Sequence, residues 1–540
     1  LGINNEHDPA FHATRRVLCA AFGFLVIIFS CLFTKQIGGW PGAYLTLLFI
    51  LLSPRFFGDS MVNPKDIPFA AGYIIALYYI SKFIKELPKP NLSTMMGIVA
   101  GIAIALNTRA GGLLLILYLF LFVGLSFLRK TYNKIPIEKD ELLKSIGYTI
   151  GIGLLSYFAG ILFWPFALHD PLVNPIKALT EFTNQPTLIN VLFKGQNIIS
   201  SKLPWNYLPH WIIRTIPLFS IFGILFFLRL VKNRSSELPF MEICILFFSI
   251  LFPISYAIYK HSTLHDGWRH FIFIYPPLIC IASIGWYLWF TSFSSKLVNG
   301  ISILLLVFLL TENLVSMISL HPYQYTYFNP LFGGLNKSYG NFETDYWMLS
   351  IQEGSQWLKD HEHIGENKPA VIATNCYYPA DIYLTDSSKN IKTIYTRYYE
   401  RSNSDWDYAL FYSRFVDRDQ LLNHTWPPKG TIYTVQAEGI PLCAIVKREN
   451  KEDYLGMEVY RKNDFESAIK HLVTASDYDP MNETVAMVLA NVYKNTCQYQ
   501  KAESTIVRSL RSRPINPEAY AILKSIQEEN KSALLNSISN

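Results

Sequence analysis

The sequence predicts a polytopic α-helical membrane bundle, followed by a small external α/β domain and a C-terminal α-helical repeat domain. Long apolar runs alternate with short polar links from residue 17 to about 316, which is typical of helices that cross a bilayer. From about residue 320 the composition is that of a soluble protein, with strand-like runs and then a repeated helical pattern. The predicted domains are 1–319, 320–450 and 451–540.

Ten apolar segments are candidate membrane spans: 17–34, 41–54, 68–81, 92–106, 111–128, 145–165, 211–228, 239–259, 271–290 and 298–316. Several are shorter than the about 20 residues that cross a bilayer, so they are either buried in the bundle or extended into the interface. The break NTRAGG at 107–112 is interpreted as a hairpin, because one continuous helix would overshoot the bilayer.

The distribution of Lys and Arg predicts the orientation. The links 82–91, 129–144 and 229–238 carry most of the basic residues between spans, and ten spans place all three on one side, which should be the cytoplasm. The links 55–67, 166–210 and 260–270 and everything after 316 are then external. We expect a protein of the inner (cytoplasmic) membrane with its C-terminal domains in the periplasm or outside the cell.

The start of the chain raises a question about topology. Residue 1 is Leu, and ten spans with an external C-terminus put the N-terminus outside as well. An external N-terminus without a signal peptide needs something upstream to carry it across. We expect one further span and its loop to precede Leu1; one miscounted span is the alternative.

Charged residues at a membrane surface are costly and usually have a task. The external stretch SPRFFGDSMVNPKDIPFA, residues 53–70, places Asp66 just before Pro68 at the start of a span. Asp66 would lie near a positive helix end, at the external mouth of the bundle. The competing interpretation is that Asp66 caps this helix, with Lys65 reaching to the interface, and position alone does not separate the two.

Basic and aromatic residues gather on the same external face. The loop 166–210 offers His169, Asp170, Lys194, Trp205 and Tyr207, and the loop 260–270 offers His265, Asp266, Arg269 and His270. Aromatic residues alone would indicate a membrane-interface belt. Arg and Lys beside them suit a phosphate, Arg bidentately and Lys as a point charge, and a lipid-linked phosphate or diphosphate would present its anion at this level.

Several motifs, in order, resemble a known family. SPRFFGDSMVNPKDIPFA, ALNTRAGG, LPWNYLPHW, DGWRHFIFIYPPL and HPYQYTYFNPLFGG are similar to the GT-C glycosyltransferases of glycosyltransferase family 39, which includes protein O-mannosyltransferases and aminoarabinose transferases of lipid A. The resemblance covers roughly residues 10–350. It implies a bundle of about eleven to thirteen helices that transfers a sugar from a polyprenyl-phosphate donor to an external acceptor.

The resemblance also implies roles for individual residues. The family uses an acidic residue in its first external loop as a base and a second one at the head of a later span; Asp66 matches the second. Asp8, with Glu6 beside it, is the nearest candidate for the first, and it is a weak match. Candidates for the donor phosphate are Arg55, Lys65, Arg109 and Arg269. An acidic Asp66 would accept the proton of the acceptor, so Asp66→Asn should abolish transfer while keeping most of a capping contribution.

Cofactor and partner expectations are limited. Some members of the wider fold use a divalent metal ion, but no dedicated ligand set is visible in the sequence, and neither is a nucleotide-binding Gly-rich loop. We expect a polyprenyl-phosphate sugar and the bilayer as partners, and no nucleic acid. Cys376 and Cys443 share the external domain and could pair, which their spacing alone does not decide.

The C-terminal part divides in two. PAVIAT, DIYLT, IKTIYT, DWDYALFY, GTIYTVQ and LCAIVKR, within 369–448, are strand-like and predict a compact lid or docking domain. After Glu452 small residues and Pro recur 34 residues on, as in Ala468 with Ala502 and Pro480 with Pro514. This period resembles tetratricopeptide repeats, which usually bind a protein partner, although structural capping is the plainer alternative.

Two further function classes compete with the transferase. The first is a non-catalytic scaffold derived from the GT-C fold, whose repeat domain recruits partners into an envelope complex. An acidic residue in the first external loop would favour the enzyme over this scaffold. The second is a transporter, which is disfavoured because no inverted repeat is visible and the polar residues lie at one face instead of the midplane.

Overall fold

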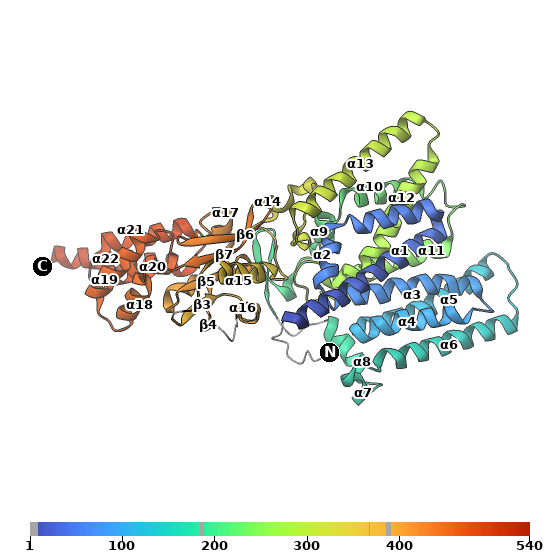
Figure 1. Ribbon diagram of the computed structural model, residues 1–540, viewed down its shortest axis with the longest axis horizontal. Coiled ribbons are helices and arrows are strands. Elements are labelled where there is room, and N and C mark those ends of the chain that lie inside the picture. Colours follow the sequence, from blue (N-terminus) through green and yellow to red (C-terminus); the bar gives the residue numbers. More distant parts are fainter. Residues whose placement is uncertain (1–8, 184–187, 367, 385–389, 540) are drawn as a thin grey trace. The chain divides into compact units, whose positions relative to one another are not determined.

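The structure is a computed structural model, and it describes residues 1–540 except 1–8, 184–187, 367, 385–389 and 540. It divides into two compact units on either side of the Gly334–Leu335 bond, later in the sequence than the domain boundary predicted at 319. We call Ala10–Gly334 the membrane unit and Leu335–Asn540 the C-terminal unit. Figure 1 shows the helices and strands of both.

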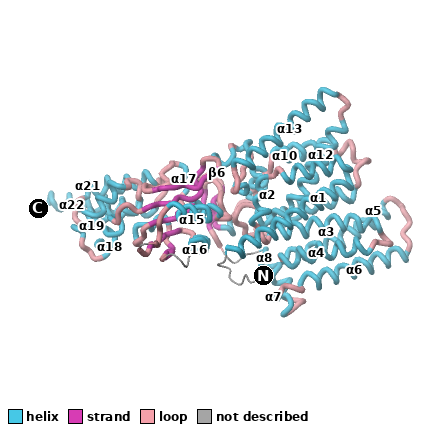
Figure 2. Tube along the Cα trace, viewed as in Figure 1, coloured by secondary structure: helices cyan, strands magenta, loops and turns pink. Residues whose placement is uncertain are grey.

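The membrane unit is almost entirely helical (Figure 2). A short antiparallel hairpin, β1 (Asn190–Phe193) and β2 (Gln196–Ile199), interrupts the long loop after α8. The 3₁₀ turns η1 (Ala110–Gly112) and η3 (Arg269–Ile274) precede α5 and α12. The helices are α1 (Pro9–Leu51), α2 (Pro54–Val62), α3 (Asp66–Glu86), α4 (Leu92–Thr108), α5 (Leu113–Tyr132), α6 (Lys139–Ile161), α7 (Pro165–His169), α8 (Asn174–Thr183), α9 (Tyr207–Thr215), α10 (Leu218–Leu230), α11 (Phe240–Tyr259), α12 (Tyr275–Ser292) and α13 (Lys296–Ser319).

The helices support an integral membrane protein, with fewer full-length spans than the ten predicted. Among the described residues, seven helices are long and apolar enough to cross a membrane, or eight if the bent pair α9 and α10 is one span. Three predictions account for the difference. The first two segments fall on the single helix α1, the segment 92–106 is the 17-residue α4, and the segment 211–228 is split by the 112° bend between α9 and α10.

Helix α1 nevertheless reverses direction within its length. Gly39 is non-helical, with φ 61°, and the Thr46 hydroxyl donates a hydrogen bond to the Thr34 hydroxyl at 3.0 Å. Residues twelve apart in a straight α-helix lie about 18 Å apart, so this contact requires the chain to fold back at Gly39. The predicted segments 17–34 and 41–54 therefore lie on two arms of a helical hairpin.

The stretch after this hairpin differs from the sequence interpretation. An external polar link is predicted over 55–67, whereas Pro54–Val62 forms α2, with Arg55 and Asp59 buried. Pro54 at the first helical position pre-sets the backbone for a helix start. The break at NTRAGG agrees with a hairpin, since a Cβ at Gly112 would collide with the backbone of Leu106.

The basic links lie together at one end of the bundle. Lys85, near the end of α3, forms an ion pair with the buried Glu242 at the start of α11, and the Arg129 guanidinium lies over the Phe240 ring at 4.5 Å. These contacts bring the predicted cytoplasmic links 82–91, 129–144 and 229–238 to the same end. Asp66, at the other end of α3, is a helix length away. Which membrane side this end faces stays a prediction.

Helices α3 and α4 cross closely through glycine. A Cβ on Gly72 would lie 2.6 Å from the backbone nitrogen of Ala105 and from the Gly101 carbonyl oxygen, and a Cβ on Gly101 would lie 2.6 Å from the Ala76 nitrogen. Small residues four apart on both helices permit such backbone contact in membrane bundles.

Substituting one of these glycines should separate the two helices. We expect Gly72→Ala to lower the stability of the membrane unit by about 1–3 kcal/mol, the usual cost of overpacking. Gly151→Ala is the matched control, because nothing lies within 4 Å of its Cβ, and alanine there should stabilise α6 by about 0.5–1 kcal/mol. Thermal melting in detergent measures both. Equal melting temperatures would contradict the close crossing.

The C-terminal unit joins a mixed sheet to a set of helices. The sheet has the strand order β4-β3-β5-β7-β6, in which β3 is parallel to β4 and β5, and β7 is antiparallel to β5 and β6. Its elements are α14 (Gly334–Ser338), α15 (Leu349–His361), β3 (Ala370–Thr374), α16 (Tyr377–Leu384), β4 (Ile391–Tyr395), β5 (Tyr408–Tyr412), α17 (Arg418–Leu422), β6 (Thr431–Ala437) and β7 (Ile440–Lys447).

One predicted strand is wrong. DIYLT is expected to be a strand, but its first four residues lie in α16, and Thr385 lies outside the described residues. The reason is topological: β3 and β4 are adjacent and parallel, and two parallel neighbours need a crossover connection, which is usually a helix. The apolar residues Ala380, Ile382 and Leu384 are buried within this helix.

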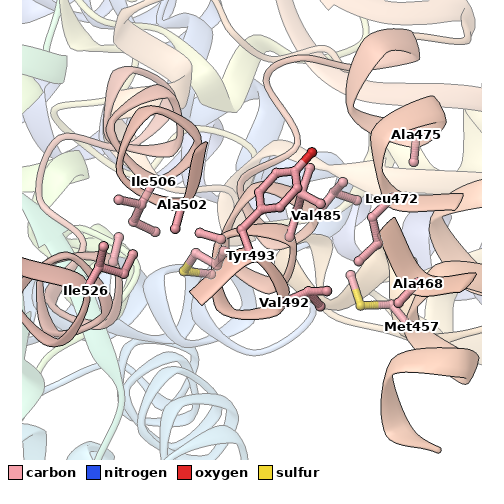
Figure 3. Packing of buried hydrophobic residues seen from close by; sticks show 14 residues of the cluster. Met457, Ala468, Leu472, Ala475, Val485, Val492, Tyr493, Ala502, Ile506 and Ile526 are labelled. Atoms are coloured by element: carbon pink, nitrogen blue, oxygen red, sulfur yellow. The ribbon is translucent and has the colours of Figure 1, made fainter. Parts of the chain in front are cut away.

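The last five helices pack in sequence. They are α18 (Glu452–Arg461), α19 (Phe465–Tyr478), α20 (Glu483–Asn495), α21 (Tyr499–Ser512) and α22 (Pro517–Ser539). Helix α21 starts 34 residues after α19 (499 − 465), which matches the predicted period. Figure 3 shows side chains from all five helices in one core, among them Met457, Leu472, Val492, Ile506 and Ile526. The assignment to tetratricopeptide repeats stays a prediction.

Cys376 and Cys443 are free, buried thiols. Burial raises the pKa of Cys376 to about 12, with a further contribution from the Asp345 carboxylate, and burial also raises the pKa of Cys443. Protonated thiols are poor nucleophiles, so the two cysteines act as small core residues.

Candidate functional site

Asp66 lies at the first position of α3 and is held on both oxygens. One accepts from the side-chain amide of Asn63 at 2.8 Å, and the other forms an ion pair with Arg109. The Asn63 side chain in turn accepts from the backbone N–H of Asp66 at 2.9 Å. This reciprocal pair resembles a capping box, with Pro64 between the partners. Asp66, the first residue of α3, is therefore held by Asn63 just before the helix and, at the same time, is the ion-pair partner of Arg109 at the end of α4.

Arg109 comes from the NTRAGG break. It ends α4 in an extended conformation before η1, so the chain turns where its guanidinium meets α3. The side chains of Asp66 and Arg109 are only 3% and 12% exposed, which makes this a buried ion pair. Such a pair contributes little net stability, but losing one partner is costly.

The loop 260–270 supplies a second ion pair. Arg269 contacts Asp266 at 2.8 Å, and both are largely buried. Asp266 and Gly267 both have left-handed backbone conformations, with φ 57° and 69°, which Asp tolerates better than most residues. The turn is fixed from α9: the Gly267 N–H donates to the Tyr207 hydroxyl at 3.1 Å, and the Trp268 indole donates to Thr215 at 2.8 Å.

His270 is where the two ion pairs meet. It lies in η3, which packs against α3, it is 8% exposed, and its ring contacts His265 edge to face at 4.7 Å. Four other charged or titratable side chains lie near enough to act on its ring: Arg269, Arg109, His265 and Lys65. Residues from positions 65, 109, 265 and 269 thus lie within electrostatic range of one imidazole, and His265 contacts it.

An apolar pocket opens beside this cluster. Its volume is about 100 Å³, somewhat less than the roughly 150 Å³ cavity that holds a benzene molecule, so it suits one small apolar group. Its polar lining includes His270 and the nearby Thr263 and Ser262. The apolar lining comes from α3, α5, α11 and η3, and includes Phe69, Tyr73, Leu114, Phe252, Phe271 and Phe273.

Other predicted site residues have different surroundings. Arg55 donates to the Tyr327 carbonyl oxygen at 3.0 Å and lies over the Phe328 ring. Asp170 accepts from the backbone N–H groups of Leu172 and Val173. Lys194, in the β1–β2 turn, lies over the Phe193 ring. His169 and Trp205 are exposed. Within the described ranges, these contacts do not connect the five residues to His270. Asp8 lies outside the described residues.

Two features escape the sequence analysis. Asn63 holds Asp66, and the spacing Asn63-x-x-Asp66 is itself a capping-box signal that could have been recognised. The pocket has no such signal, because its aromatic residues come from three separate elements, α3, α11 and η3. For metal ions, the described part of the chain contains no group of three or more His, Cys, Asp or Glu residues suited to hold one.

No family model matches the chain. Two solved structures resemble it: ArnT from Cupriavidus metallidurans bound to undecaprenyl phosphate, and the same protein in the apo state. Each is 11% identical over 80% of this chain and 83% of ArnT, with TM-scores of 0.36 and 0.37. Similarity at this level carries no functional argument, so the conclusions below rest on the residues of this chain.

Proposed function

We propose that this protein is a membrane glycosyltransferase that takes a sugar from a polyprenyl-phosphate donor, with the donor phosphate bound at the cluster around His270. One observation carries the proposal: a group of cationic side chains lies beside an apolar pocket at one end of the bundle. Lys65, Arg109 and Arg269 stand against two carboxylates, Asp66 and Asp266. The cluster therefore carries more positive than negative charge, and it suits an anion.

The apolar pocket favours a lipid-linked phosphate over a soluble one. A soluble phosphate would gain nothing from Phe69, Phe271 and Phe273, whereas a lipid phosphate could insert the first isoprene unit of its chain among them. Arg269 and Arg109 would bind phosphate oxygens by charge-assisted hydrogen bonds, and Lys65 would act as a point charge. The position at span ends supports a headgroup at membrane-surface depth.

The same groups can assist transfer. When the bond between the anomeric carbon and the phosphate breaks, negative charge accumulates on the departing phosphate. Fixed cations that are already in place stabilise that charge without reorganisation. The acceptor sits on the external side in this proposal, and its hydroxyl loses a proton to a nearby base. A divalent metal ion is not needed for these steps.

Binding of undecaprenyl phosphate to the full chain in nanodiscs tests the proposal. We expect Arg269→Gln to weaken binding roughly 10- to 100-fold, because a hydrogen bond to a charged group contributes about 1.5–3 kcal/mol. Lys194→Gln is the matched control, since Lys194 lies in the β1–β2 turn, and it should bind like the wild type. Release of labelled sugar from a panel of undecaprenyl-phosphate monosaccharides tests transfer. A wild-type chain that neither binds nor transfers would favour the non-catalytic scaffold, with its helical repeats as the partner-binding part.

A further inference from the structure

His270 differs from the acidic residues around it in what its side chain contacts. Both oxygens of Asp66 are engaged, by Arg109 and by Asn63, and Asp266 is paired with Arg269. The His270 ring lines the pocket and contacts the edge of His265, and within the described part of the chain it makes no hydrogen bond. The imidazole ring is thus available to a bound molecule.

Asp66 and Asp266 are each held by an arginine, and both oxygens of Asp66 are already engaged. A neutral imidazole has a nitrogen that can accept a proton, and histidine is the commonest general base in enzymes. The two aspartates therefore position the cations, and a different group accepts the proton.

We propose that His270 is the catalytic base of the transfer reaction and that Asp66 is a positioning residue that holds Arg109. The proposal rests on the proposed function. The acceptor hydroxyl oxygen forms a bond to the anomeric carbon of the sugar while the bond from that carbon to the phosphate oxygen breaks. The electron pair of the broken bond leaves with the polyprenyl phosphate, and the hydroxyl proton passes to the His270 ring.

The charge balance of this step suits the cluster. The groups that face His270 from neighbouring elements are Lys65, Arg109, His265 and Arg269, with Asp66 and Asp266 paired to the two arginines. Positive neighbours oppose a further positive charge on the ring. However, the phosphate gains one negative charge as it leaves, and this offsets the charge that the ring gains. The proton then returns to water or to the released phosphate.

The test measures donor binding and transfer separately, with the full chain in nanodiscs. Undecaprenyl phosphate is the binding probe, and a panel of undecaprenyl-phosphate monosaccharides is the transfer probe. His270→Gln should bind undecaprenyl phosphate within about threefold of the wild type and transfer at least about 100-fold more slowly, the usual contribution of a general base. Added imidazole should restore transfer to His270→Ala, which covers the case in which the Gln variant folds poorly.

Asp66→Asn distinguishes the positioning role. It should weaken undecaprenyl phosphate binding, and acetate or formate should not restore transfer to Asp66→Ala, whose shorter side chain leaves room for the added anion. Transfer by His270→Gln within threefold of the wild type would overturn the assignment, and so would rescue of Asp66→Ala by acetate together with no rescue of His270→Ala by imidazole. A wild-type chain that binds undecaprenyl phosphate but transfers no sugar would overturn the role of His270 and leave the lipid site standing. Absence of binding would overturn the proposed function itself.

Discussion

Asp66→Asn is expected to destabilise the membrane unit by about 3–5 kcal/mol, because it removes one partner of a buried ion pair. The sequence alone suggests a smaller effect, since asparagine keeps most of a capping contribution of about 1 kcal/mol. The ion pair, which joins positions 43 residues apart (109 − 66), changes that expectation. Thermal melting of the full chain in detergent measures the loss.

Two variants check this explanation. Asp66→Asn combined with Arg109→Gln removes both charges and should recover most of the lost stability, because an unpaired buried charge costs more than the pair contributes. Asp170→Asn is the matched control, since Asp170 accepts from two backbone N–H groups, and it should cost about 1 kcal/mol or less. If the double variant is as unstable as Asp66→Asn alone, the buried pair is not the cause.

The second large effect lies in the C-terminal unit. Arg401, near the sheet, is 5% exposed and contacts Glu483 at 3.4 Å and Asp479 at 3.5 Å, both from the helical repeats. Burial alone would lower the pKa of Arg401, but Tyr398 and these two carboxylates raise it, so it stays charged. We expect Arg401→Met to destabilise this unit by about 3–5 kcal/mol, because two carboxylates are left facing each other.

A nearby arginine offers the comparison. Arg397 contacts Glu400 at 3.6 Å, and both side chains are well exposed, so Arg397→Met should melt together with the wild type. Hydrogen exchange should show faster opening of α20 in Arg401→Met, since Glu483 begins that helix. Unchanged exchange there would mean that the arginine does not join the sheet to the repeats.

The sequence predicts where the helices of the membrane unit lie better than it predicts how the chain bends and reverses between them. Each of the ten apolar segments falls on a helix, because apolar composition over such lengths is a strong signal. The reversal at Gly39 and the bend between α9 and α10 depend on single backbone conformations and tertiary contacts, which hydropathy does not contain. Likewise, the charged residues Arg55 and Asp59 predict a polar link at 55–67, whereas both are buried in the helix Pro54–Val62.

The sequence predicts many residues of the candidate site, but it does not predict how they are arranged in space. Asp66, Lys65, Arg109 and Arg269 are predicted from the sequence because each is a charged residue at a span end, and that criterion applies equally to Arg55. Nothing in the sequence says which span ends are neighbours. The packing of α3 against α4 and η3 decides that Arg109 reaches Asp66 and that η3, with His270, lies against the same helix. The strand predicted at DIYLT is wrong for a similar reason, because parallel pairing of β3 and β4 requires a crossover connection between them, which here is a helix.

A structure of the full chain in nanodiscs with undecaprenyl phosphate would test the central claim most directly. We predict phosphate density in contact with Arg109 and Arg269, next to the His270 ring, with the first isoprene unit among Phe69, Phe271 and Phe273. Phosphate density at another part of the membrane unit, or an empty pocket at saturating lipid, would contradict the account.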